Sequence, residues 1–117
     1  MILYIDTTDF SKITFAISDG KKVQQKSFVV DPHKSHETLQ KLEEFLKKFG
    51  IQPHLPASSP RQEKRGPIKK IYVNKGPGSY TGTRIGVTIG QALGMAWDVP
   101  VTFLNKNMYD QKLASKK

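Results

Sequence analysis

The chain has 117 residues, a formal net charge of +9 and a hydrophobic fraction of 37%. This length is typical of one domain with its own core. The sequence contains no cysteine, which excludes disulfide scaffolds, thiolate metal sites and cysteine nucleophiles. No apolar run approaches the ~18 residues of a membrane helix, and the N-terminus does not read as a secretory signal. We therefore expect a cytoplasmic protein that makes no membrane contact.

The first third of the chain predicts a three-stranded meander. Residues 2–5 are consecutive large residues, which is typical of a strand covered on both faces. Within residues 13–17 the side chains of Ile13, Phe15 and Ile17 share one face with a period of two, and Asp19-Gly20 indicates a hairpin turn. A third strand is expected over residues 22–30, and the Asp31-Pro32 pair ends it.

The first predicted helix covers residues 36–49, with Ser35 as its N-cap and Gly50 as its stop. Apolar residues recur in it at spacings of three and four: Leu39, Leu42, Leu46 and Phe49. Residues 52–67 then hold four of the seven prolines. We expect this stretch to form a flexible, exposed, basic loop.

The remaining elements are a fourth strand beginning at Ile68, a second helix over residues 83–97 and a fifth strand over residues 101–104. The resulting order is βββαβαβ. An antiparallel meander followed by two helical crossovers predicts the α/β class, with a mixed five-stranded sheet and two main helices.

Two segments carry most of the positive charge. Residues 61–75 hold six basic residues against one glutamate, and residues 105–117 hold four lysines against one aspartate. A local cationic excess attracts polyanions such as RNA. The alternative is a solvated loop and a solvated tail, which charge blocks of this kind commonly form. The candidate RNA contacts are Arg61, Lys64, Arg65, Lys69 and Lys70.

The stretch between the fourth strand and the second helix, residues 76–82, reads GPGSYTG. A helix N-terminus after a glycine-rich turn can bind an anion. The stretch lacks the Gly-Lys-Ser/Thr ending of a P-loop and the glycine spacing of a dinucleotide fingerprint. The motif therefore does not indicate either standard phosphate loop.

Four glycines recur every four residues along the second helix: Gly82, Gly86, Gly90 and Gly94. A glycine inside a helix costs about 1 kcal/mol relative to alanine, and positions four apart share one helix face. The stripe predicts a shallow groove that another backbone approaches closely. Because the helix has Arg84 and Asp98 as its only charges, we interpret the groove as a contact for another protein. The alternative is that this helix packs against the first helix of the same chain.

Three stretches together resemble the TsaB (YeaZ) family, which acts in tRNA threonylcarbamoyladenosine biosynthesis. They are ILYIDTT at residues 2–8, SHETL at residues 35–39 and GPGSYTGTRIGV at residues 76–87. The resemblance covers residues 1–105 and leaves residues 106–117 as a basic C-terminal tail. It implies an actin/hexokinase-like (ribonuclease-H-like) fold and only one lobe of the two in a family member.

The resemblance also implies a role, that of a non-catalytic scaffold subunit without a cofactor. Such a subunit pairs through its two helices with a TsaD-like catalytic subunit and works with a TsaE-like ATPase. The complex transfers threonylcarbamoyl to N6 of adenosine 37 in tRNA, so tRNA is met through the complex. A homodimer is expected when the partner is absent. The expected interface residues are Thr83, Arg84, Gly86, Val87, Gly90, Leu93, Gly94, His36 and Leu39.

Asp6, Thr7 and Thr8 lie where this superfamily has its first phosphate turn, and we consider them a candidate vestigial site. His33 and His36 lack a third ligand, so no metal site is expected. The sequence has no Ser/His/Asp set or paired carboxylates for hydrolysis, so no catalytic residue is assigned. Two other functions stay open, a stand-alone small nucleotide-binding enzyme of the actin-like ATPase superfamily and a basic RNA-binding module.

Overall fold

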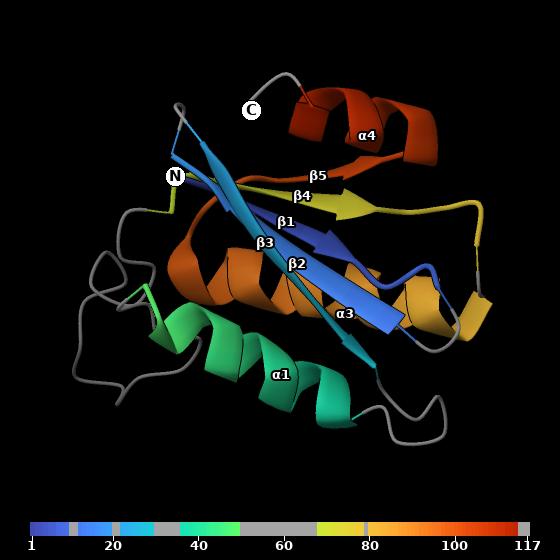
Figure 1. Ribbon diagram of the computed structural model, residues 1–117, viewed down its shortest axis with the longest axis horizontal. Helices are drawn as coiled ribbons and strands as arrows, with labels where there is room; N and C mark the ends of the chain where they lie inside the picture. The colour runs from blue at the N-terminus through green and yellow to red at the C-terminus, as the bar shows by residue number, and fades with distance from the viewer. Residues whose placement is uncertain (10–11, 20–21, 30–35, 50–67, 79, 115–117) are drawn as a thin grey trace.

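The computed structural model describes residues 1–9, 12–19, 22–29, 36–49, 68–78 and 80–114. Five strands and three helices follow one another along the chain (Figure 1). The strands are β1 (Ile2–Asp6), β2 (Lys12–Ser18), β3 (Val23–Val29), β4 (Lys70–Asn74) and β5 (Val101–Leu104). The helices are α1 (His36–Lys47), α3 (Tyr80–Trp97) and α4 (Lys106–Ala114). Within these residues no helix is long and apolar enough to cross a membrane.

The strands form one mixed sheet in the order β3-β2-β1-β4-β5. β2 pairs antiparallel with both β1 and β3, whereas β4 lies parallel between β1 and β5. The predicted meander, the five strands and the mixed sheet are therefore confirmed. Because β1, β4 and β5 are parallel, their carboxyl ends meet at one edge of the sheet, and this edge positions the candidate site.

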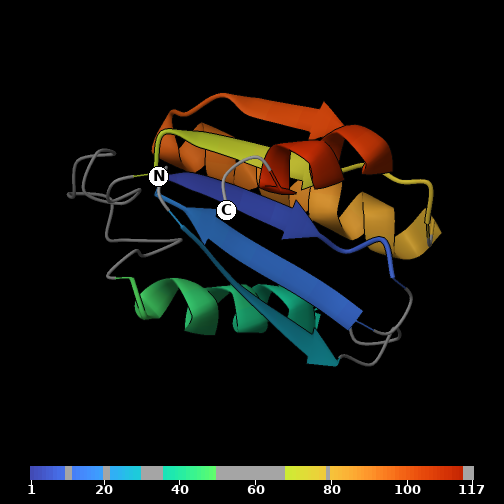
Figure 2. The ribbon, with the colours of Figure 1, turned by 45° about the horizontal axis from the view of Figure 1, so that its top comes forward.

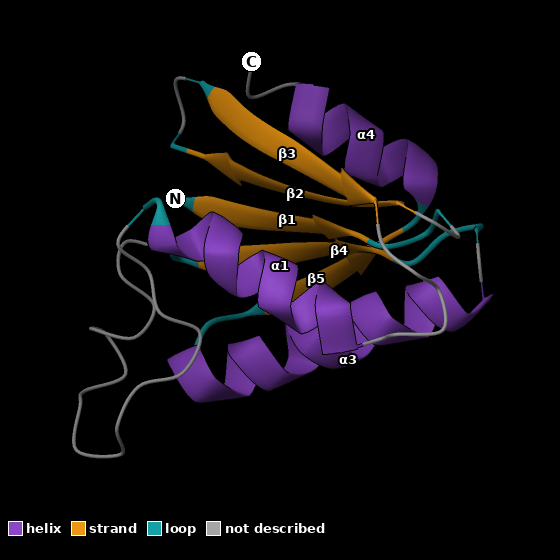
Figure 3. Cartoon of the chain, turned by 60° about the horizontal axis from the view of Figure 1, so that its bottom comes forward, coloured by secondary structure: helices purple, strands orange, loops and turns teal. Residues whose placement is uncertain are grey.

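One face of the sheet is covered by α1 and α3, which lie side by side across it (Figure 3). Strand residues at the centre of this face are fully buried, among them Leu3 and Ile5 of β1 and Val73 of β4. Helix α1 contributes Leu42 and Leu46, both 0% exposed, to the same core. The helical spacing predicted these two contacts, whereas Leu39, which follows the same spacing, is 42% exposed.

The opposite face of the sheet carries α4, which was expected only as part of a basic tail. Tyr109 of α4 is 2% exposed and packs edge-on against Tyr4 of β1, with ring centroids 5.7 Å apart. Tyr72 of β4 joins this smaller cluster. The N-terminus of α4 is capped by the Asn105 side chain, which accepts a hydrogen bond from the Met108 amide at 2.9 Å. Residues 106–114, expected as part of a basic tail, thus form a helix that packs on the sheet through Tyr109 and Leu113.

Helix α3 begins at Tyr80, three residues before the predicted start, and its glycine stripe faces the chain's own sheet. A Cβ on Gly90 would lie 2.6 Å from Cγ2 of Val73, and one on Gly94 would collide with Val101. A Cβ on Gly86 would likewise collide with the Thr7 hydroxyl. The three glycines are therefore needed for close helix–sheet packing. The expectation that they form a groove for a foreign backbone is wrong, because strands β1, β4 and β5 occupy that side.

Candidate functional site

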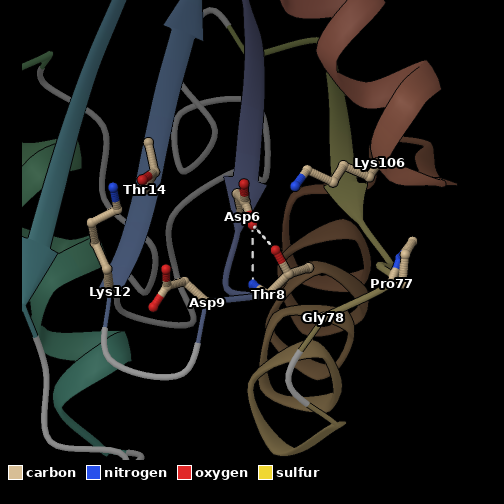
Figure 4. Close-up of a pocket in the computed structure, with 8 residues that line it drawn as sticks. All are labelled: Asp6, Thr8, Asp9, Lys12, Thr14, Pro77, Gly78 and Lys106. Atoms are coloured by element: carbon tan, nitrogen blue, oxygen red, sulfur yellow. Dashed lines mark hydrogen bonds between the residues drawn. The ribbon is translucent and has the colours of Figure 1, made fainter.

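A polar pocket with a volume of about 320 Å³ lies at the carboxyl ends of the parallel strands (Figure 4). Asp6 ends β1, Pro77 and Gly78 follow β4, and Lys106 begins α4 directly after β5. The full lining is Asp6, Thr8, Asp9, Lys12, Thr14, Pro77, Gly78 and Lys106. Residues of β1, β2, α4 and the turns after β1 and β4 thus surround one space at the edge where β1, β4 and β5 end.

The floor of the pocket is an Asp turn. One carboxylate oxygen of Asp6, Oδ1, accepts hydrogen bonds from the Thr8 amide at 3.0 Å and from the Thr8 hydroxyl at 2.7 Å. Such side chain–backbone bonds fix the conformation of a short turn. Thr7 between them points away from the pocket, is 2% exposed and contacts α3 at Gly86. Of the three predicted residues of the phosphate turn, Asp6 and Thr8 therefore line the pocket and Thr7 does not.

The glycine-rich stretch forms the wall of the pocket next to the Asp turn. Gly76 has a φ of 103°, a left-handed conformation that glycine adopts without strain. Its amide donates to the Asn74 side chain at 2.9 Å, and its carbonyl accepts from the Lys106 amide at 2.8 Å. A Cβ on Gly78 would lie 2.5 Å from Cβ of Thr8. Glycine at 78 therefore lets this wall touch the Asp turn.

Charges of both signs face the pocket. Figure 4 shows Lys12 and Lys106 on opposite sides of Asp6, with Asp9 below Lys12. Lysine ammonium groups and threonine hydroxyls bind phosphate or carboxylate oxygens, and aspartates bind cations or ammonium groups. The arrangement suits a small polar ligand. Within the described residues no three His, Cys, Asp or Glu side chains gather into a metal site.

Tyr109 of α4 is affected by the charge of one pocket residue, Asp6. Burial and, after it, the negative charge of Asp6 raise the pKa of the Tyr109 phenol. Burial also raises the pKa of Tyr4, with Tyr72 as a second cause. The phenol oxygens of Tyr4 and Tyr109 have no hydrogen-bond partner within the described part of the chain. Burial thus disfavours the charged form of both tyrosines, and Asp6 adds to this effect only at Tyr109.

Lys12, Thr14 and Lys106 are pocket residues that the sequence reasoning missed. Lys12 and Thr14 belong to β2, whose register places Thr14 opposite Asp6. Lys106 follows β5, and the carboxyl ends of parallel strands share one edge. The βαβ order around the glycine stretch was therefore a usable signal for Lys106, whereas the position of Lys12 depends on the hairpin register.

A second candidate surface is the outside of the α1–α3 layer. Of the predicted interface residues, Arg84 and Leu39 are exposed, and Thr83 and Val87 are half-buried. Leu93 is 4% exposed and belongs to the core, so its assignment to the interface is wrong. The assignment of the three glycines is wrong as well, because they face the chain's own sheet. The side chain of His36 lies outside the described residues. The exposed face of α3 is instead made by Arg84, Thr88, Gln91, Ala92 and Met95.

The predicted RNA contacts are only partly described. Arg61, Lys64 and Arg65, like the whole loop of residues 52–67, lie outside the described residues. Lys69 is exposed, whereas the Lys70 ammonium lies 5.4 Å from the centroid of the Tyr72 ring and 3.5 Å from its hydroxyl. Lys70 is thereby held against the sheet beside Tyr72.

Comparisons with known proteins agree with this fold and with the resemblance. The family model described as TsaD, tRNA N6-adenosine threonylcarbamoyltransferase, matches residues 62–108. The tRNA threonylcarbamoyladenosine biosynthesis protein TsaB of Bacillus subtilis (strain 168) is 54% identical over 35 residues, which are 30% of this chain and 15% of that protein.

Solved structures extend the likeness over most of the chain. YeaZ from Pseudomonas aeruginosa superimposes with a TM-score of 0.67 at 20% identity, covering 89% of this chain and 42% of that one. A protein from the same organism with similarity to peptidase YeaZ gives a TM-score of 0.68 with the same identity and coverage. The chain thus spans less than half the length of these relatives. Its fold is the actin/hexokinase-like α/β fold, and the resemblance to the TsaB (YeaZ) family is confirmed.

Proposed function

We propose that the chain is a non-catalytic subunit in the formation of N6-threonylcarbamoyladenosine at position 37 of tRNA. In this proposal it pairs with a TsaD-type catalytic subunit, with a TsaE-type ATPase as a further component, and it meets tRNA through the complex. The observation that carries the proposal is the match of residues 62–108, since this segment includes the glycine-rich wall and α3. The identity of 54% between this chain and a TsaB protein over 35 residues supports the same modification system.

The pairing surface is the outer side of α1 and the adjacent flank of α3. Both helices lie on one face of the sheet (Figure 3), and Leu39 of α1 is 42% exposed. Ile85 and Ile89 of α3 are half-buried and Ala92 is exposed, all on one flank of that helix. Apolar side chains gathered on a surface mark sites for protein contact. The surface called the α1–α3 face below consists of Leu39, Ile85, Ile89 and Ala92.

The pocket supports a non-catalytic assignment for the chain. Its described side chains are aspartates, lysines and threonines, and Asp6 is already engaged by Thr8. A nucleophile with an adjacent oriented base is the usual requirement for transfer chemistry. Among the described lining residues the hydroxyl–carboxylate pair of Thr8 and Asp6 is engaged in fixing the turn itself. The chemistry is accordingly assigned to the partner.

Binding to a purified TsaD-type subunit tests the proposal. A charge placed in an apolar contact is left without water or counterion, so Leu39→Glu and Ala92→Glu should each weaken binding by at least about 10-fold. Gln25→Glu on β3 is the matched control and should bind like the wild type, because Gln25 is exposed and pairs with Ala16, which belongs to the cluster on the opposite face of the sheet. Equal titration curves for all four proteins would exclude the α1–α3 face, and no binding of the wild type would exclude the proposal.

A second function is favoured by the mixed charges of the pocket. Lys12, Lys106 and the threonine hydroxyls are groups that would bind the phosphates of a nucleotide. Titration with ATP should then give a heat signal that Asp6→Ala alters. An RNA-binding module is the third reading, and it predicts tRNA affinity that falls steeply with salt and is reduced by Lys69→Ala.

A further inference from the structure

Three lysine side chains converge at the β3 border of the sheet, which has α1 below it in Figure 2. Lys26 belongs to β3, Lys41 belongs to α1 and Lys48 follows the last residue of α1. The ammonium groups of Lys26 and Lys41 lie 5.3 Å and 5.7 Å from the centroid of one ring, that of Phe28. The Lys48 side chain comes within hydrogen-bonding distance of Lys26. These three residues are called the lysine cluster below.

The Phe28 ring fixes the position of the cluster. Lys26 and Phe28 are two residues apart on β3, so both side chains lie on the face of the sheet that α1 covers. The Phe28 ring packs against the buried ring of Phe15, with centroids 6.2 Å apart. An ammonium group is attracted to the face of an aromatic ring. Two of the three lysine ends are therefore held in place before any ligand arrives, which lowers the ordering cost of binding.

The charges within the cluster are not balanced. Lys41 has a carboxylate neighbour, since its ammonium group lies 3.7 Å from Glu44. The contact with Lys48 and the like charge of Lys48 lower the pKa of Lys26, and Glu44 offsets only part of this effect. Two ammonium groups in contact repel each other, and an anion placed between them removes the repulsion. The cluster is thus prepared for an added negative charge.

Protection of the sheet border accounts for only one of these lysines. A lysine on an edge strand discourages the addition of a further strand, and Lys26 on β3 is enough for this purpose. Lys41 and Lys48 come from outside the sheet and add their charges at the same place. A binding role explains why all three side chains meet.

We propose that the lysine cluster binds the phosphate backbone of tRNA. The inference rests on the proposed function in one respect, because that function supplies tRNA as the polyanion. Lysine ammonium groups bind phosphate as point charges, and such contacts supply the sequence-independent part of nucleic-acid affinity. The net charge of +9 on the whole chain attracts a polyanion over a longer range.

The cluster stays accessible when a partner covers the α1–α3 face. Leu39 of that face and Lys41 are two residues apart on α1, so they point about 200° apart around the helix axis. Helix α3 packs on β1, β4 and β5 through its glycines, whereas Lys26 lies on β3 at the other border of the sheet. A TsaD-type subunit and tRNA would therefore contact different sides of α1.

Fluorescence anisotropy of a labelled, unmodified tRNA transcript over a salt series tests the proposal with the full chain. The combined variant Lys26→Gln, Lys41→Gln and Lys48→Gln should bind more than about 10-fold more weakly, and its slope of log K against log salt should be smaller by about 2. The combined arginine variant at the same three positions keeps the charge and should bind like the wild type. Circular dichroism and a thermal melt confirm that each variant is folded.

A single-charge comparison supplies the matched control. Lys48→Gln and Lys112→Gln each remove one exposed lysine, but Lys112 belongs to α4 on the opposite face of the sheet. Lys48→Gln should reduce the salt slope by about 1, whereas Lys112→Gln should leave it unchanged. Equal losses in these two variants would mean that only the net charge matters and would overturn the proposal.

Three further results would also overturn it. The combined glutamine variant could bind tRNA like the wild type, or the arginine variant could lose as much affinity as the glutamine variant. Binding of polyglutamate could instead fall in the glutamine variant while tRNA binding stays the same, which would assign the cluster to an acidic protein. The glutamine variant should still bind a TsaD-type subunit like the wild type. Failure of the proposed function would appear separately, as a wild type that does not bind this subunit.

Discussion

The packing of α3 on the sheet makes Gly90→Ala a sharp test. An alanine in a helix is about 1 kcal/mol more favourable than a glycine, so the substitution would stabilise an exposed helical position. At Gly90 the new Cβ would lie 2.6 Å from Cγ2 of Val73, a side chain that is 0% exposed. Inserting a methyl group into a well-packed core costs about 1–3 kcal/mol. The overpacking term is the larger, and we expect a net loss of about 1 kcal/mol.

The assay is a thermal melt followed by circular dichroism, where 1 kcal/mol corresponds to a shift of roughly 4 °C for a chain of this size. Thr88→Ala on the exposed face of α3 is the matched control, and it should stabilise by about 0.5 kcal/mol. The decisive comparison is the effect of Gly90→Ala with and without the Val73 side chain. In a Val73→Ala background the obstructing Cγ2 is gone, so Gly90→Ala should become stabilising. A higher melting temperature of Gly90→Ala in the wild-type background would refute this packing.

Two further predictions concern the end of α3 and the outer tyrosine cluster. Asp98 follows the last residue of α3 with a φ of 58°, a left-handed conformation that suits glycine better, so Asp98→Gly should stabilise by about 0.5–1 kcal/mol in urea unfolding. The Tyr109 hydroxyl is buried and has no hydrogen-bond partner within the described residues, so Tyr109→Phe should stabilise by about 1 kcal/mol at neutral pH. Because burial raises the pKa of Tyr109 from the ordinary value of 10.0, the folded state favours the neutral phenol, and stability should fall as pH rises above about 10. Tyr109→Phe should fall less over the same range, and parallel pH profiles of the two proteins would contradict this reasoning.

The strands and α1 could be predicted because the spacing of their apolar residues is compatible with only one type of secondary structure. Ile13, Phe15 and Ile17 alternate along β2, and all three are buried on the helix-covered face. Leu42 and Leu46 share one side of α1 and reach the same core. In these elements the spacing of apolar residues alone determines which side faces inward.

The partner of the glycine stripe could not be predicted from its spacing. A stripe of small residues indicates that some backbone comes close, but the period is the same whether that backbone belongs to a sheet or to another protein. Gly86 and Gly94 meet Thr7 and Val101, which are distant in the sequence. Helix α4 was missed for a related reason, since Met108, Tyr109 and Leu113 do not mark a continuous apolar face and one buried ring holds the helix in place.

The candidate pocket was predicted only at its floor. Asp6 and Thr8 come directly after an apolar strand, so their position at a strand end could be predicted from the sequence. Lys12 and Lys106 reach the same space through the β1–β2 register and the parallel β4–β5 pair. Strand register and strand pairing are tertiary features, so they cannot be predicted from the pattern of residues within one segment.

The most direct test of the proposed function is to map where a TsaD-type subunit contacts this chain. Amide resonances of the ¹⁵N-labelled chain, recorded with and without the unlabelled partner, report the contact residue by residue. The account predicts shifts at Leu39, Ile85, Ile89 and Ala92, with β3 unchanged. Shifts confined to β3 or to the pocket around Asp6, or none at saturating partner, would contradict it.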